Sequence, residues 1–273
     1  MDVEAALQQL ANDPAAPLDP AEVALRLAQD EYPHLDVEGY LSELDCMAHE
    51  VKAYLRGDLD VQVHGLCRYL FHEMGFHGNT QDYYDPKNSY LNDVLDRRTG
   101  LPITLSIVAM ALGRRAGMDV QGVGLPGHFI AKAIAPGHEI FFDPFHGGRR
   151  LTPEECGQLI EQVTCKPFRV TRKALEAAPL GWIIVRMLTN LKGVYLKAED
   201  YARLIRVTER LRQLAPEDAT QVRDLGATFL QAGQPGKAID HLEAYLTSTP
   251  QGSDADAVRQ LLTQAKSLLA RWN

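Results

Sequence analysis

The chain has 273 residues, of which 45% are hydrophobic and 23% are charged. That is enough for one large or two ordinary globular domains with a substantial core. The formal net charge is −8 at pH 7, which argues against a general nucleic-acid binder because phosphate neutralisation needs clustered Lys and Arg. We therefore predict no nucleic-acid partner.

The N-terminal segment 1–17 is rich in Ala, Asp and Pro, and we expect it to be loosely held and flexible. It lacks the basic start and apolar run of a secretory signal, and no stretch approaches the roughly 18 apolar residues of a membrane span. The cysteines are scattered without a CxxC pair, which favours free thiols in a reducing compartment. These features predict a cytoplasmic protein with no membrane partner. The cysteines are Cys46, Cys67, Cys156 and Cys165.

Helical spacing of apolar residues dominates the chain from residue 18 to about residue 80. Asp19 is a good N-cap for a helix whose first residue is Pro20. A second helical pattern closes at Gly57 and a third at Gly75, where glycine is favoured as a helix C-cap. This part is predicted to contain three helices.

The pattern changes after about Asp82. A helix is predicted from Leu101 or Pro102 to Gly117, followed by short apolar segments between Gly and Pro that predict two or three strands. Pro136-Gly137 is a good turn between two of these strands. Thr152 and Glu155 then form a capping-box pattern before a further helix.

The last hundred residues carry an internal repeat. Pro216 and Pro250 end two similar helical segments and lie 34 positions apart, which is the period of tetratricopeptide repeats. Two such units are fewer than usually fold alone, so we expect them to pack on the preceding domain.

Chemistry is suggested by His128, which begins one predicted strand, and Asp143, which ends the next. If the two strands pair as a hairpin, the carboxylate can accept the imidazole N–H and fix its tautomer. A purely structural His–Asp pair remains an equal alternative. The nearby helix start has Pro102, which has no nucleophilic atom.

Other groups offer no clear nucleophile or metal ligand set. Thr104 and Ser106 lie in the first turns of the helix, where hydroxyls usually bond backbone carbonyls. His72 and His77 are five residues apart, whereas a zinc-protease helix needs a spacing of four. We predict no metal and no cofactor.

Three segments together resemble a known family. "NSYLNDVLDRRTGLPITLSIV", "GVGLPGHFIAKA" and "FFDPFHGGRRLTPEEC" are similar to the bacterial SirB-type branch of the transglutaminase-like superfamily, whose members often carry C-terminal tetratricopeptide repeats. The resemblance covers residues 20–170. It implies a papain-like Cys-His-Asp triad in which Gly100 matches the motif glycine, Pro102 falls at the Cys position, and Ser106 falls at the small residue.

The resemblance also implies that His128 and Asp143 are the remnant of the triad. Losing the thiol removes the covalent step of such mechanisms. Polar residues before the helix and after Asp143 then become candidates for binding a partner at the rim of the cleft. The residues predicted for binding are Asn88, Asn92, Arg97, Arg98, Thr104, His146 and Arg149.

The expected architecture is α+β: a mainly helical N-terminal part, a papain- or transglutaminase-like core with a helix on a small antiparallel sheet, and a helical repeat tail. The predicted division is 1–17, 18–178 and 179–273. The leading functional hypothesis is a scaffold that binds a protein or peptide through the cleft, the repeats or both. The alternative is a hydrolase or acyl-transfer enzyme that uses His128 and Asp143 with another nucleophile or an activated water.

Overall fold

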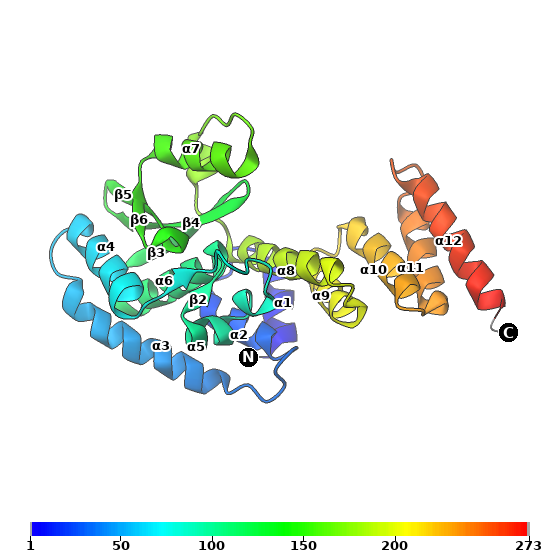
Figure 1. Ribbon diagram of the computed structural model, residues 1–273, viewed down its shortest axis with the longest axis horizontal. Coiled ribbons are helices and arrows are strands. Elements are labelled where there is room, and N and C mark those ends of the chain that lie inside the picture. The colour runs from blue at the N-terminus through cyan, green and yellow to red at the C-terminus, as the bar shows by residue number, and fades with distance from the viewer. Residues whose placement is uncertain (1, 272–273) are drawn as a thin grey trace. The chain divides into compact units, whose positions relative to one another are not determined.

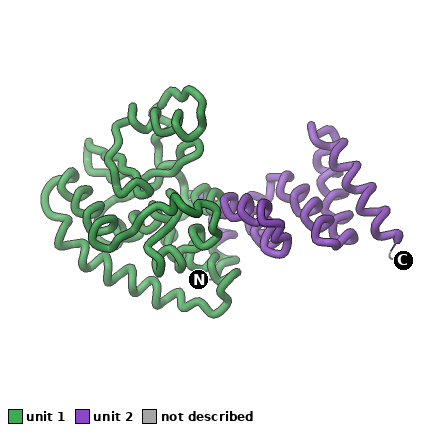
Figure 2. Tube along the Cα trace, in the orientation of Figure 1, with its two compact units in different colours: residues 1–6, 15–187 green, residues 7–14, 188–273 purple. Residues whose placement is uncertain are grey.

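The structure is a computed structural model that describes residues 2–271 (Figure 1). It confirms the α+β class, with helices in the majority and two small sheets. The described chain forms two compact units, coloured separately in Figure 2. The first contains residues 2–6 and 15–187, and the second contains residues 7–14 and 188–271. Neither unit is one continuous stretch of chain.

The N-terminal segment is helical. Its composition predicts a loosely held segment, but helix α1 runs from Val3 to Asn12. The side chains of Leu7 and Leu10 are almost fully buried. Burial of two leucines at helical spacing stabilises the segment by an amount that composition alone does not reveal.

The three predicted helices are confirmed, and each begins at an aspartate. The carboxylates of Asp19, Asp36 and Asp58 accept backbone N–H groups of the first turn, which otherwise lack partners. The third helix continues as a π-helical stretch that the sequence did not predict. The elements are α2 (Pro20–Ala28), α3 (Val37–Val51), η1 (Lys52–Tyr54), α4 (Leu59–Cys67) and η2 (Arg68–Glu73).

The next segment leads into the central helix α6 (Pro102–Ala116). Nearly all side chains of α6 up to Gly113 are buried, as expected for a helix surrounded by other elements. Gly117 ends it with φ +89°, as predicted. The short elements before it are β1 (His77–Gly78), η3 (Pro86–Asn88), α5 (Leu91–Arg97) and β2 (Thr99–Gly100), and β1 pairs with β2 in parallel.

A four-stranded antiparallel meander follows α6, one strand more than the upper prediction. Its order is β3-β4-β5-β6, and Pro136-Gly137 forms the β4–β5 turn as predicted. Helix α6 packs against β3 and β4. The strands are β3 (Asp119–Leu125), β4 (His128–Ala135), β5 (His138–Asp143) and β6 (Arg149–Leu151), with η4 (Pro144–His146) between the last two.

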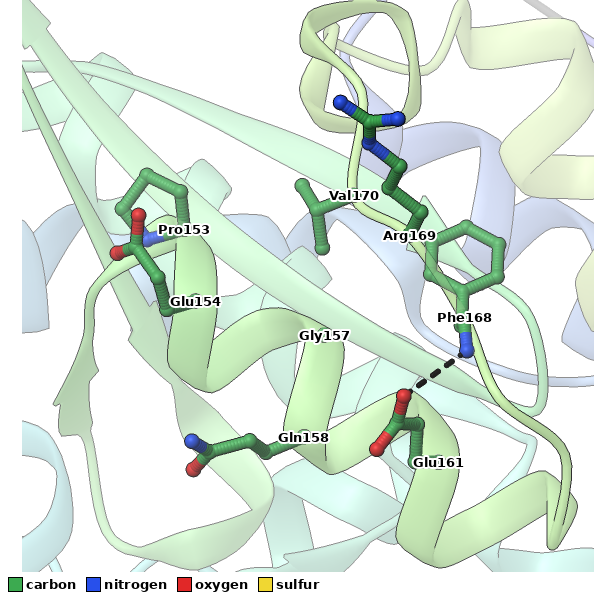
Figure 3. A pocket seen from close by; sticks show the side chains of 8 residues that line it. All are labelled: Pro153, Glu154, Gly157, Gln158, Glu161, Phe168, Arg169 and Val170. Carbon is green, nitrogen blue, oxygen red and sulfur yellow. Dashed lines mark hydrogen bonds between the residues drawn. The ribbon is translucent and has the colours of Figure 1, made fainter.

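Helix α7 (Pro153–Thr164) packs on the sheet through Cys156 and Ile160, which join a core cluster with Ile130 and Phe141. The predicted capping box is present: Thr152 and Glu155 exchange side-chain to backbone hydrogen bonds. The chain then returns along α7 and encloses a surface pocket, where the Glu161 carboxylate accepts the Phe168 N–H at 3.0 Å (Figure 3). A short helix η5 (Arg172–Leu175) precedes the repeats.

The C-terminal helices confirm the repeat. Helices α9 and α11 begin at Tyr201 and Pro235 and end at Leu214 and Ser248, so both ends are 34 positions apart. At Gly226 a Cβ would lie 2.7 Å from Leu242, so only glycine permits this close helix approach. The helices are α8 (Leu180–Lys197), α9 (Tyr201–Leu214), α10 (Ala219–Gln231), α11 (Pro235–Ser248) and α12 (Ala255–Ala270).

Two adjacent glycines allow a test of packing beside η4. Both have positive φ, but a Cβ on Gly148 would meet Phe71 at 2.6 Å and Cys67 at 2.7 Å, whereas a Cβ on Gly147 would meet nothing within 4 Å. We expect Gly147→Ala to lower the free energy of unfolding by about 1 kcal/mol because of backbone strain. Gly148→Ala should lower the free energy of unfolding by about 1 to 3 kcal/mol more than Gly147→Ala does, because its methyl group overpacks the site. Urea unfolding followed by circular dichroism measures both, and equal losses would contradict this packing argument.

Candidate functional site

The site is organised around the carboxylate of Asp143, which ends β5 and is the N-cap of η4. Its side chain is 1% exposed. Oδ1 accepts the Phe145 backbone N–H at 3.0 Å. The turn that follows β5 therefore fixes the carboxylate, and Oδ2 is left to face other donors.

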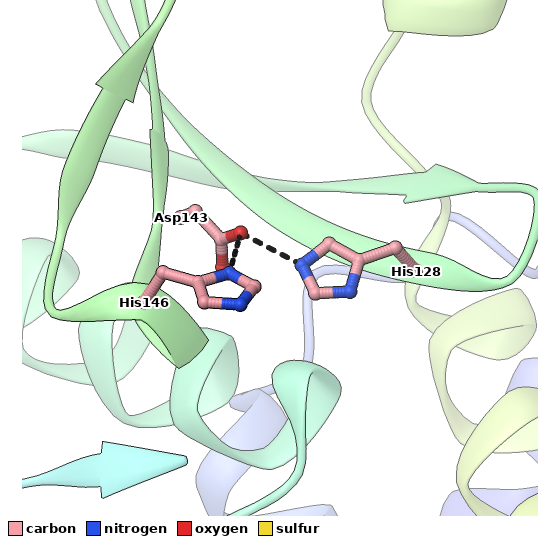
Figure 4. A group of neighbouring side chains, drawn as sticks. All are labelled: His128, Asp143 and His146. Carbon is pink, nitrogen blue, oxygen red and sulfur yellow. Dashed lines mark hydrogen bonds and ion pairs between the residues drawn. The ribbon is translucent and has the colours of Figure 1, made fainter. Parts of the chain in front are cut away.

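His128, the first residue of β4, binds this carboxylate. Its Nε2 lies 2.9 Å from Asp143 Oδ2 (Figure 4). The β4–β5 register pairs Ala131 with Phe142, so continuing it places Asp143 opposite Ile130. His128 is two residues from Ile130 and hence on the same face of the sheet. The hairpin brings the two residues together diagonally across neighbouring strands.

His146 supplies a second imidazole to the same oxygen. Its Nδ1 lies 2.7 Å from Asp143 Oδ2, and its ring centroid is 5.7 Å from that of His128 (Figure 4). The His146 side chain is 51% exposed, whereas His128 is only 5% exposed. Since an ionised carboxylate only accepts, each imidazole donates an N–H to it.

Electrostatics keep this carboxylate ionised. Burial by itself raises the pKa of Asp143, but the hydrogen bonds and charge interactions with His128 and His146 outweigh burial, and the net pKa is lowered. Among the described residues, Asp143 forms ion pairs with these two histidines and with no Lys or Arg. Its hydrogen-bond donors are the two imidazoles and the Phe145 backbone N–H.

An aromatic group surrounds the imidazoles. The Phe145 ring lies 6.1 Å from His128 and 5.2 Å from His146, and the Tyr83 ring lies 6.1 Å from Phe145. Tyr83 is 40% exposed and Tyr84 is 57% exposed. The buried pair therefore adjoins an aromatic surface that is open to solvent.

Asn88 holds the loop that carries this surface. Its side-chain amide donates to the backbone carbonyls of Asp82 and Tyr83, and its Oδ1 accepts from Asn79. Its own carbonyl accepts the Thr104 hydroxyl at 2.9 Å. Asn88 and Thr104, both predicted to bind a partner, are buried and bonded within the chain. They position Tyr83 relative to the start of α6.

The start of α6 carries Pro102 at the first helical position, and this proline is buried. The Ser106 hydroxyl donates to the Pro102 carbonyl at 2.8 Å, and Thr104 bonds the Leu101 backbone, as expected for hydroxyls in a first turn. At Gly100 a Cβ would lie 2.7 Å from Thr104 Oγ1. The motif glycine therefore makes room for this capping hydroxyl.

The cysteines do not supply a nucleophile. In the described structure, no Cys or Ser side chain is hydrogen-bonded to His128. Burial raises the pKa of the Cys67 thiol to about 12 and that of Cys156 to about 11, so both are inert at neutral pH. Cys46 and Cys165 are exposed, on α3 and at the end of α7.

The arginines that the sequence singled out are paired within the chain. Arg97 lies 2.9 Å from Asp85, Arg98 lies 2.9 Å from Glu43, and Arg149 lies 3.0 Å from Glu155. Arg149 keeps 63% of its side chain exposed, whereas Arg97 and Arg98 are 33% and 28% exposed. Asn92 is buried, and its Oδ1 has no hydrogen-bond partner among the described residues.

One arginine that sequence reasoning missed contacts the site. Arg186 of α8 donates to the backbone carbonyls of Leu125 and His128 at 2.8 and 2.7 Å, so it braces the β3–β4 turn that positions His128. Its guanidinium also lies 5.6 Å from the Phe129 ring centroid. It lies far from His128 in the sequence, and no local pattern marks it.

The fold agrees with comparisons to known proteins. Residues 38–189 match the family model of the transglutaminase-like superfamily, and residues 191–263 match a tetratricopeptide repeat model. The first match covers more than half of the chain. The chain therefore belongs to the transglutaminase-like superfamily and carries a tetratricopeptide-repeat tail.

Several of the similar proteins are named UPF0162. One from Xylella fastidiosa is 35% identical over 245 residues, covering 86% of both chains. One from Pseudomonas aeruginosa is 30% identical over 234 residues, covering 85% of this chain and 84% of that protein. F-box only protein 21 of Mus musculus is 32% identical over 154 residues, covering 53% of this chain and 23% of that protein. The described residues contain no helix long and apolar enough to cross a membrane.

The lowered pKa of Asp143 predicts a pH-dependent contribution to stability. A carboxylate with a depressed pKa stabilises the fold above its unfolded-state pKa of about 3.9, and this contribution is lost as the pH falls through the folded-state pKa. Asp143→Asn should therefore be about 1 to 3 kcal/mol less stable than the wild type at pH 7. The difference should shrink below about pH 4. Urea unfolding at several pH values between 7 and 3 measures it, and a constant difference would contradict the assignment.

Proposed function

We propose that the protein is a non-catalytic scaffold of the SirB-type branch, which binds a protein or peptide beside a remnant of the transglutaminase-like active site. The observation that carries the proposal is the start of α6. Pro102 occupies the position that the family resemblance assigns to the Cys nucleophile, and the neighbouring hydroxyls are engaged with the backbone. A site with a His–Asp pair and no nucleophile favours binding over covalent catalysis.

The surface next to His128 supports a binding role. Tyr83 and Tyr84 are exposed, and the Tyr83 ring lies next to the half-buried Phe145 ring. The Asn88 amide holds their loop by donating to the Tyr83 carbonyl. Exposed tyrosines on a rigid base are typical of protein-binding surfaces because they bury large area with little loss of side-chain freedom. The tetratricopeptide repeats add a second type of surface that commonly contacts proteins.

A hydrolase or acyl-transfer enzyme remains a second proposal, because the His128–Asp143 pair is intact. The lowered pKa of Asp143 keeps it ionised, and an ionised partner favours the imidazolium that a general base forms after taking a proton. In this mechanism His128 would activate a water or an incoming nucleophile. It predicts turnover that depends on His128.

We also propose a cytoplasmic location and the division of the chain into residues 18–178 and 179–273. The location is supported by four unpaired thiols, which are typical of reducing compartments. The two matched families support two domains, and their ranges meet near residue 190 rather than at residue 178. The second compact unit also includes residues 7–14, so any functional separation must account for the N-terminus.

Restoring sulfur at position 102 tests the assignment of the nucleophile position. Pro102→Cys should place a thiol at the first turn of α6, where the helix dipole and His128 lower its pKa below the ordinary value of about 8.5. The thiolate absorbance is followed against pH with Cys46 and Cys165 replaced by Ser. Adding His128→Ala should raise the thiol pKa. An unshifted thiol pKa that is insensitive to His128 would contradict the assignment.

Capture experiments test the binding role itself. Immobilised full-length protein should retain a specific protein from a lysate of the source cells, and Tyr83→Ala with Tyr84→Ala should weaken retention about 10-fold or more, because anchor residues of this kind contribute about 2 kcal/mol. Val61→Ala, at a site on α4 that is 50% exposed, is the control and should bind normally.

The opposite result would favour the enzyme. If the double variant binds like the wild type, and the wild type turns over amide or ester substrates at a rate that His128→Ala abolishes, the scaffold proposal is wrong.

A further inference from the structure

We propose that His128, Asp143 and His146 form a binding site for one divalent transition-metal ion of the zinc type. The scaffold role does not require such an ion, so this inference goes beyond the proposed function. A remnant of a Cys-His-Asp triad needs only one imidazole on the carboxylate. The second imidazole, from His146, is the feature that a triad does not explain.

The ligand atoms are already gathered. One nitrogen of each histidine and one carboxylate oxygen all lie within 4.8 Å of one another (Figure 4). Among the described residues this is the one such group of three or more His, Cys, Asp or Glu side chains. In tetrahedral sites with zinc–ligand bonds of about 2.0 to 2.1 Å, neighbouring ligand atoms are separated by about 3.3 Å. The present hydrogen bonds of 2.7 and 2.9 Å would therefore open by only about half an ångström.

The charge balance favours a cation. Asp143 is 1% exposed, and its ion-pair partners among the described residues are two histidines, with no Lys or Arg. A divalent ion would replace the two N–H donors and place a positive charge beside the buried carboxylate, since metals bind imidazole through the unprotonated nitrogen.

The site is accessible and adjustable on one side. His128 and Asp143 are held rigidly by the β4–β5 hairpin, whereas His146 is half-exposed and ends the short helix η4. Gly147 follows it with φ +68° and no neighbour near its missing Cβ. His146 can therefore move toward an ion that enters from solvent. Three protein ligands also leave a fourth position for water, as in open zinc sites.

The donor set selects the kind of metal. Two imidazole nitrogens and one carboxylate suit Zn²⁺, Co²⁺ or Ni²⁺, whereas Mg²⁺ and Ca²⁺ prefer sites made entirely of oxygen ligands. Co²⁺ is a useful probe because its visible spectrum reports the coordination number. We expect the absorption pattern of a four- or five-coordinate site with nitrogen ligands.

The experiment uses the tag-free full-length protein with Cys46→Ser and Cys165→Ser, which remove the two exposed thiols as competing ligands. Isothermal titration with Zn²⁺ at pH 7.5 should show one tight site per chain. His146→Ala removes one ligand and should weaken binding about 100-fold or more, since even losing a group that only orients a ligand costs about 10- to 100-fold.

His138→Ala is the matched control. His138 is as exposed as His146 and lies 3.4 Å from Asp60, but this pair has no third ligand within reach in the described structure. We expect the His138→Ala variant to bind Zn²⁺ with the same affinity as the parent protein. Circular dichroism of each variant checks that the fold is retained.

Two outcomes would overturn the proposal. If the parent protein takes up no stoichiometric Zn²⁺, the three side chains are only a hydrogen-bonded cluster. If His146→Ala binds Zn²⁺ as tightly as His138→Ala, the ion lies elsewhere. Neither outcome affects the capture experiment with the Tyr83 and Tyr84 variant, so the metal-site proposal and the scaffold proposal can be disproved independently.

Discussion

One buried carboxylate holds the candidate site together. Asp143 receives three N–H donors, from the Phe145 backbone, His128 and His146, and it is shielded almost completely from water. An ionised group in such a position is tolerated only when its acceptor capacity is used. The direction of η4, the orientation of the His128 ring and the placement of Phe145 all follow from this requirement. The aromatic surface at Tyr83 depends on it indirectly, through Phe145.

The molecule combines a well-preserved acid–base pair with a helix start that has no nucleophile. The β4–β5 hairpin explains how the two side chains meet, because its register places them on the same face of the sheet. It does not explain why the pair is kept. A partner-binding surface, a water-activating base and a metal site each give the pair a reason to persist, and they differ in which neighbour matters: Tyr83, a substrate, or His146.

The sequence was informative where a local pattern determines geometry. Pro136-Gly137 defined the hairpin turn, the turn fixed the register, and the register brought His128 to Asp143. Aspartate caps and the 34-residue period located helices in the same way. The sequence failed where pairing is long-range. Arg98 forms an ion pair with Glu43, and Arg186 donates a hydrogen bond to the carbonyl of His128. Neither interaction can be predicted from composition or spacing.

The division of the chain has a consequence for how the molecule is made. Residues 7–14 belong to the second compact unit, although the rest of that unit begins at residue 188. During synthesis on the ribosome, residues 7–14 are made well before the rest of the second unit, so they cannot pack in that unit until residues from 188 onward have been made. Because Leu7 and Leu10 are buried in the complete chain, we expect this helix to finish packing only after residues from 188 onward have been made. A chain shortened before residue 188 is then expected to leave these two leucines more exposed to solvent.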